Sequence, residues 1–85
     1  TVSDHLKVLG FVPLSSRGKY QLYLLDLPPS FSLVIEGTYD KKSGKYFYDF
    51  YSMKLDPKTK KSKQHRIYCT HVPVKVMYRR VRNYL

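Results

Sequence analysis

The sequence predicts a mostly β fold, a small antiparallel five-stranded barrel or strongly bent sheet of the OB or SH3-like kind. Five segments have strand-like composition, short turn-like connectors separate them, and one segment alternates apolar and polar residues with a period of two. Strands joined by such short connectors run antiparallel, and closure of the sheet would remove its exposed edges. The 85 residues suffice for one domain, which we place at 1–85.

Each expected strand ends at a cluster of Gly, Pro, Ser or charged residues. The strands cover His5–Leu14, Lys19–Leu27, Phe31–Asp40, Lys45–Leu55 and His65–Val74. The connectors are SSRG (15–18), PPS (28–30), KKSG (41–44) and DPKTKKSKQ (56–64). Gly44 can supply the positive φ of a four-residue hairpin loop, and Pro57 suits the first central position of a type I turn that begins at Asp56.

The last segment, KVMYRRVRNYL (75–85), allows either a further strand or a short C-terminal helix. Its apolar residues recur at spacings of three and four, at Val74, Met77, Tyr78, Val81 and Leu85. This spacing puts them on one face of a helix, so we favour the helix.

Aromatic residues fall on both faces of the expected strand Lys45–Leu55. One face carries Phe47, Asp49, Tyr51, Met53 and Leu55, and the other carries Tyr46, Tyr48, Phe50, Ser52 and Lys54. A thin domain has a single core, so only one of the two faces can be buried in it. We assign Phe47, Tyr51, Met53 and Leu55 to the core and expect Tyr46, Tyr48 and Phe50 to meet a ligand. Exposed tyrosines also raise strand propensity without any ligand, or bury a protein partner.

Positive charge is concentrated in the second half of the chain. The formal net charge is +10, of which residues 1–40 contribute −1 and residues 41–85 contribute +11. Such asymmetry indicates a polyanionic partner, most often nucleic acid, with an anionic membrane surface as the weaker rival. A charged surface that serves solubility alone is the plain alternative.

Three elements make up the predicted nucleic-acid-binding surface. Tyrosine rings on a basic sheet can stack on unpaired bases, lysines in a turn contact phosphates as point charges, and arginines bind phosphate bidentately. The predicted residues are Lys41, Lys42, Lys45, Tyr46, Tyr48, Phe50, Lys54, Lys58, Lys60, Lys61, Lys63, Arg66, Arg79, Arg80 and Arg82.

Catalytic and metal-binding chemistry is not predicted. His65, Cys69 and His71 share strand parity, but their spacing lacks the close ligand pairs of a structural zinc site, and only His5 could be a fourth ligand. We therefore predict no metal and no cofactor, and we interpret Cys69 as a small buried hydrophobe. A small nuclease with His65 or His71 as general base is the enzymatic alternative.

The sequence also predicts an intracellular, cytoplasmic protein with no membrane partner and no small-molecule substrate. No run approaches the roughly 20 apolar residues of a membrane helix, and the N-terminal TVSDHLK does not resemble a signal peptide. The single cysteine excludes an internal disulfide and fits a reducing compartment.

The Lys-, Tyr- and Val-rich composition, the single cysteine and the lack of tryptophan resemble small basic proteins of hyperthermophilic archaea. These include chromatin proteins with SH3-like barrels and accessory subunits of replicative DNA polymerases. The resemblance is one of composition, so no site residue carries over from it. With the charge, it implies a non-catalytic nucleic-acid-binding accessory subunit of a replication, transcription or ribonucleoprotein complex, with a larger protein as second partner. The alternatives are a stand-alone chromatin or RNA-binding protein and a pure protein-interaction subunit.

Overall fold

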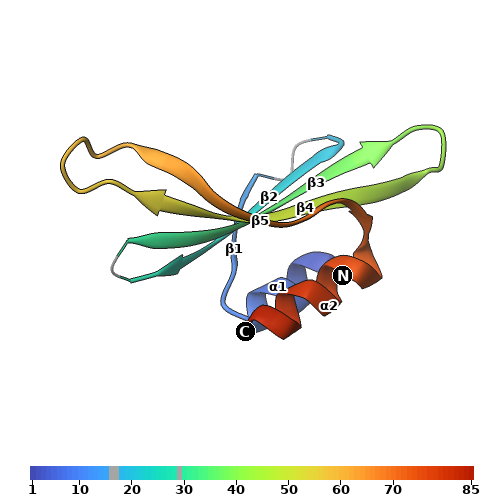
Figure 1. Cartoon of the computed structure of the whole chain (residues 1–85). Helices are drawn as coiled ribbons and strands as arrows, with labels where there is room; N and C mark the ends of the chain where they lie inside the picture. Colours follow the sequence, from blue (N-terminus) through green and yellow to red (C-terminus); the bar gives the residue numbers. More distant parts are fainter. Residues whose placement is uncertain (16–17, 29) are drawn as a thin grey trace.

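The computed structural model of the chain describes residues 1–15, 18–28 and 30–85 (Figure 1). Within these residues the elements in chain order are α1 (Val2–Val8), β1 (Val12–Ser15), β2 (Tyr20–Leu27), β3 (Phe31–Asp40), β4 (Lys45–Leu55), β5 (Ser62–Pro73) and α2 (Val74–Tyr84). The strands form one sheet in the order β1-β2-β3-β4-β5, and every neighbouring pair is antiparallel. The prediction of a mostly β fold with five antiparallel strands and a C-terminal helix is confirmed.

The sheet is strongly twisted, and in the described part of the chain it does not close into a barrel (Figure 1). Strands β1 and β5 are its edges, so the barrel form of the prediction does not apply and the bent-sheet form does. Both helices cover the same face of the sheet (Figure 1), which we call the helix face. We call the opposite side the open face.

The first expected strand, His5–Leu14, is wrong in its first half because Val2–Val8 form helix α1. Thr1 caps this helix, since its hydroxyl accepts a 3.2 Å hydrogen bond from the backbone N–H of Asp4, whose carboxylate in turn faces the Thr1 amine. Leu6 turns inward and is fully buried. Only Val12–Ser15 pairs as a strand, with β2. The capping pattern TVSD is the sequence signal for this helix.

One hydrophobic core lies between the helix face and the two helices. Alternate residues of the three central strands enter it, and α1, α2 and the segment after α1 close it. Its buried members are Leu6, Phe11, Tyr23, Leu33, Ile35, Tyr48, Phe50, Met77 and Val81. Met77 and Val81 lie four residues apart on α2, as the three-four spacing predicts.

The two faces of β4 are assigned the wrong way round by the sequence analysis. Tyr48 is 1% exposed and Phe50 is 0% exposed, because both point from the sheet toward the helices. Phe47, Tyr51 and Met53 are only half-buried on the open face, and Leu55 is 41% exposed. One set of rings does belong to the core, as predicted, but it is the set with Tyr48 and Phe50 and not the set with Phe47 and Tyr51. The face with Tyr48 and Phe50 is buried because both helices pack on that side of the sheet.

Gly37 on β3 is what allows the Tyr48 ring into the core. The two residues are paired across β3 and β4. A Cβ atom on Gly37 would lie 2.6 Å from Cε2 of Tyr48, a distance that real side chains do not tolerate. Any side chain at position 37 would therefore displace this ring.

Two hairpins share one turn design. In the β3–β4 turn, Asp40 accepts a hydrogen bond from the Lys42 N–H through its carboxylate and from the Gly44 N–H through its backbone carbonyl. In the β4–β5 turn, Asp56 accepts the equivalent bonds from the N–H groups of Lys58 and Lys60. Gly44 has φ +70°, which confirms the prediction for this glycine. The SSRG and PPS connectors include residues 16, 17 and 29, which lie outside the described residues.

Lys60 occupies the position that Gly44 holds in the other hairpin, with φ +57°. The left-handed conformation costs a non-glycine residue about 1 to 2 kcal/mol. We expect Lys60→Gly to raise the free energy of unfolding by about 1 kcal/mol in urea denaturation. Lys58→Gly is the matched control, because Lys58 has no positive φ and glycine there only adds freedom to the unfolded chain. Equal stability of the two variants would contradict this reading of the turn.

Candidate nucleic-acid interface

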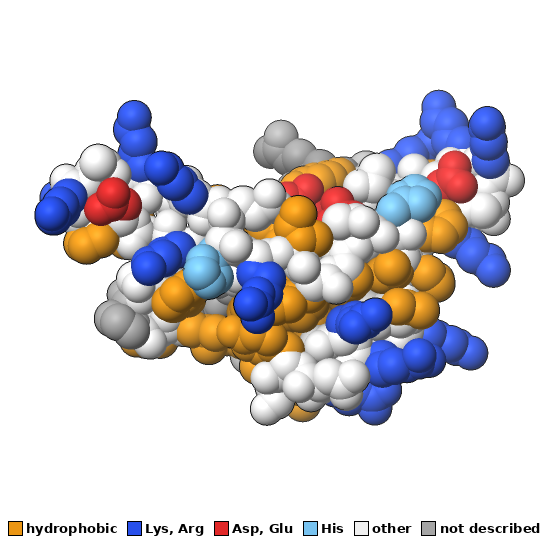
Figure 2. All heavy atoms as spheres, viewed as in Figure 1, with side chains coloured by type: hydrophobic (Ala, Val, Ile, Leu, Met, Phe, Trp, Pro, Cys, Tyr) orange, Lys and Arg blue, Asp and Glu red, His pale blue; other side chains and the backbone are white. Residues whose placement is uncertain are grey.

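The lysines and arginines of the predicted binding surface are all exposed. They are Lys41, Lys42, Lys45, Lys54, Lys58, Lys60, Lys61, Lys63, Arg66, Arg79, Arg80 and Arg82. The molecule measures 43 × 22 × 20 Å along its principal axes, and the two lysine-bearing hairpins project toward opposite ends of the long axis (Figure 1). Figure 2 shows Lys and Arg side chains gathered over these two tips and over α2. Most of the predicted charge thus forms two distant clusters.

The β3–β4 end carries Lys41, Lys42 and Lys45 in and beside its turn. The backbone carbonyl of Lys19 accepts a hydrogen bond from Tyr39, which brings Lys19 to this same end. The ammonium group of Lys19 lies 5.2 Å from the centre of the Tyr39 ring, a cation–π contact. Sequence reasoning left Lys19 out of the surface, because only the strand pairing places it beside the β3–β4 turn.

The β4–β5 end carries the longer lysine cluster. Lys54 and Lys63 are directly paired across the two strands, and Lys58, Lys60 and Lys61 occupy the turn. Like charges placed opposite each other destabilise a strand pair. Asp56 is the one acid of the turn between these two strands, and the backbone N–H groups of the turn donate hydrogen bonds to it.

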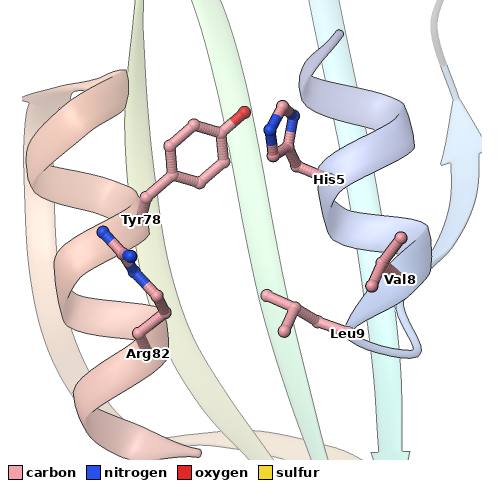
Figure 3. Close-up of a pocket in the computed structure, with 5 residues that line it drawn as sticks. All are labelled: His5, Val8, Leu9, Tyr78 and Arg82. Atoms are coloured by element: carbon pink, nitrogen blue, oxygen red, sulfur yellow. The ribbon is translucent and has the colours of Figure 1, made fainter.

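The arginines of α2 point to different places. Arg79 lines a cleft at the start of the helix, whereas Arg82 lines a groove of about 360 Å³ between α1 and α2. Figure 3 shows this groove, where the rings of His5 and Tyr78 approach across it and Arg82 projects from α2 on the same side as Tyr78. The centres of the His5 and Tyr78 rings are 5.4 Å apart. The structure therefore does not gather Arg79 and Arg82 into one phosphate site.

The positive charge is not neutralised by ion pairs in the described part of the chain. The one salt bridge there joins the Thr1 amine to the Asp4 carboxylate at 3.5 Å. The exposed lysines and arginines of the described residues therefore have no carboxylate within ion-pair distance, and their field extends into solvent.

The predicted stacking residues do not form an exposed platform. Tyr48 and Phe50 are buried, and Tyr46 is half-buried with its hydroxyl directed to the backbone carbonyl of Gly18 at 3.4 Å. A base cannot reach the faces of the Tyr48 and Phe50 rings in this fold. The prediction that Tyr48 and Phe50 stack on bases is therefore wrong, because both side chains belong to the core. The lysines and arginines of the predicted surface are exposed, as contact with phosphate requires.

The open face of the sheet carries negative charge among its rings. Tyr51 donates a hydrogen bond to the Glu36 carboxylate, and burial raises the pKa of Tyr51 well above its usual value. Tyr20 lies beside the same carboxylate, and burial first, then Glu36, raises the pKa of Tyr20. Because a carboxylate lies among these tyrosine hydroxyls, this face does not suit phosphate.

A β-bulge in β5 separates the residues of the H-x3-C-x-H pattern. Thr70 and His71 both lie opposite Asp49 of β4. His71 has a φ of +52°, and its backbone N–H donates a 2.7 Å hydrogen bond to the Asp49 carboxylate. His71 stacks on Phe47 of the open face, whereas Cys69 packs against the core. The predicted shared parity of these two residues is thus wrong, because the bulge shifts the register.

Cys69 is half-buried, and burial raises the pKa of its thiol. It packs against the core as a small apolar side chain would. Among the residues that the structure describes, no three His, Cys, Asp or Glu side chains gather as metal ligands would.

None of the described helices combines the length and apolar character needed to cross a membrane. Comparison with protein-family models, curated proteins and solved structures gave no match to this chain.

Proposed function

We propose that this protein is a non-catalytic nucleic-acid-binding subunit that holds the phosphate backbone of a nucleic acid for a larger protein. The observation that carries the proposal is the set of exposed lysines and arginines, unpaired in the described part of the chain, of which the hairpin lysines are grouped at two ends of a 43 Å molecule. Lysines bind phosphates as point charges and read no sequence, so the binding is to the backbone.

The mechanism is electrostatic. Each lysine that neutralises a phosphate releases a condensed counterion, and the entropy of that release drives binding. A nucleic acid held in this way stays at high effective concentration near a partner that acts on it. Burial of Tyr48 and Phe50 supports backbone contact over base stacking.

The spacing of the two tips favours a duplex. One turn of B-form DNA is about 34 to 36 Å long, which is comparable to the 43 Å length of the molecule. A duplex lying along the long axis can therefore offer phosphates to both lysine clusters at once. Two tips that engage together bind more tightly than either alone.

The near-neutral N-terminal half is proposed to meet the larger protein. Val8, Val12 and Leu14 are 87%, 56% and 55% exposed, and they lie at the end of α1 and along the edge strand β1. Apolar side chains grouped on an unpaired sheet edge suit a protein contact. This side carries none of the charge clusters, so both partners can be held together.

A length series of labelled duplexes tests the proposal by fluorescence anisotropy at low salt. We expect DNA or RNA duplexes of about 12 base pairs to bind in the range of about 10⁻⁶ to 10⁻⁴ M that is typical of backbone binding. Duplexes of about six base pairs reach only one tip and should bind at least tenfold more weakly. Failure of all DNA and RNA, single-stranded or duplex, to bind would overturn the proposal and leave the protein-interaction alternative.

A further inference from the structure

A cleft of about 710 Å³ lies where the start of β4 meets the N-terminal ends of both helices. Three cationic side chains line it, Lys45 from β4 and Lys75 and Arg79 from α2, and no acidic residue does. All three residues are exposed and have no carboxylate within ion-pair distance among the described residues. The cleft is therefore positively charged and open to a small anion.

The N-terminus of α2 contributes to the same cleft. Val74, Lys75 and Val76, the first turn of this 11-residue helix, line it. Pro73 occupies the cap position and offers no side-chain hydrogen bond, and the first turn has no acidic residue. The backbone N–H groups of this turn thus lack the side-chain acceptor that a helix start normally has, and the helix dipole adds positive potential there.

Tyr48 points a free hydrogen-bond donor into the cleft. Its side chain is 1% exposed, it lines the cleft, and its hydroxyl has no partner among the described residues. Every fully buried polar side-chain atom among the described residues has a hydrogen-bond partner. Because the Tyr48 hydroxyl has no such partner, the hydroxyl is the part of this side chain that remains slightly exposed. Burial raises the pKa of Tyr48 to about 12, and the hydroxyl keeps its proton at neutral pH.

We propose that this cleft binds the phosphate group of a phosphate ester, held by Lys45, Lys75, Arg79, the Tyr48 hydroxyl and the first N–H groups of α2. A helix start, cations and a buried hydroxyl that line one cleft match the donors whose hydrogen bonds phosphate oxygens accept. The choice of ligand rests on the proposed function, which this site makes more specific. The phosphate belongs to a nucleic-acid backbone or to a free nucleotide. Tyr48 then serves the site through its hydroxyl while its ring serves the core.

The test follows backbone amide resonances of the protein by two-dimensional NMR while inorganic phosphate is added. We expect saturable shifts at Val74, Lys75 and Val76. Tyr48→Phe and Arg79→Gln should each weaken phosphate binding about tenfold, because each removes one hydrogen bond to a charged group. The matched controls are Tyr23→Phe, a buried tyrosine that does not line the cleft and bonds to Gln21, and Arg80→Gln, which makes the same charge change outside the cleft.

Two further titrations, with a nucleoside monophosphate and with a 12-base-pair duplex, separate the two sources of phosphate. Shifts of the α2 amides by both ligands assign the site to backbone phosphates, and shifts by the monophosphate alone assign it to a free nucleotide. Absence of shifts at residues 74–76 with every ligand, or equal losses in the variants and their controls, would overturn the cleft. Duplex binding by the lysine hairpins is measured separately by anisotropy. A failed phosphate site in the cleft can therefore be distinguished from a failure of the proposed function.

Discussion

Replacement of Phe50 by alanine is expected to lower the free energy of unfolding by about 3 to 5 kcal/mol. Phe50 is completely buried on the helix face, and its ring packs 4.8 Å from the centre of the Tyr68 ring. Alanine would leave a cavity that the surrounding strands and helices fill only in part. Since small domains have total stabilities of about 5 to 15 kcal/mol, the variant should lose a large part of the stability of the domain.

Phe47→Ala is the matched control, because it makes the same chemical change three residues away on the open face. Phe47 is half-buried and stacks on His71 with ring centres 4.4 Å apart. Its loss should cost about 1 kcal/mol, in proportion to the smaller apolar area that it buries. Urea denaturation of both variants gives the comparison. A larger cost for Phe47→Ala than for Phe50→Ala would restore the opposite assignment of core and surface.

Charge reversal at the β4–β5 tip, by Lys58→Glu with Lys61→Glu, is expected to weaken duplex binding at least tenfold. Each lysine that contacts a phosphate contributes about one unit to the slope of log affinity against log salt, so this slope should become shallower by about two. Lys60 is left unchanged because of its positive φ in the turn. Fluorescence anisotropy at several salt concentrations measures both quantities.

The position of the charge is tested by two single variants. Lys61→Glu and Lys7→Glu change the net charge equally, but Lys61 lies in the β4–β5 turn and Lys7 lies on α1. Only Lys61→Glu should weaken binding several-fold if the hairpin contacts phosphate. Equal losses would show that net charge alone determines the affinity, and the two-tip model would be wrong.

Local sequence patterns predict most of the sheet. Phe31–Asp40 and Lys45–Leu55 are found as strands with the expected bounds, because alternation, Asp40 and Gly44 define them locally. The C-terminal helix also follows from its own spacing of apolar residues. Helix α1 is missed because seven residues with apolar and polar side chains interspersed suit a short strand as well as a short helix.

The candidate site is less predictable because it depends on tertiary contacts. Both faces of β4 are aromatic, and only the packing of α1 and α2 decides that Tyr48 and Phe50 are core. Strand pairing likewise determines the bulge at His71 and places Lys19 beside the β3–β4 turn. Charge, in contrast, is exposed almost wherever it occurs, so the exposure of the lysines and arginines can be predicted from sequence.

The salt dependence of duplex binding by the unmodified protein tests the central claim most directly. With both lysine tips on the backbone, five or more phosphates are neutralised, and a plot of log affinity against log salt should have a slope of about −4 or steeper. A slope between zero and about −1, or no binding at low salt, would contradict backbone binding and assign the basic half of the molecule to another partner.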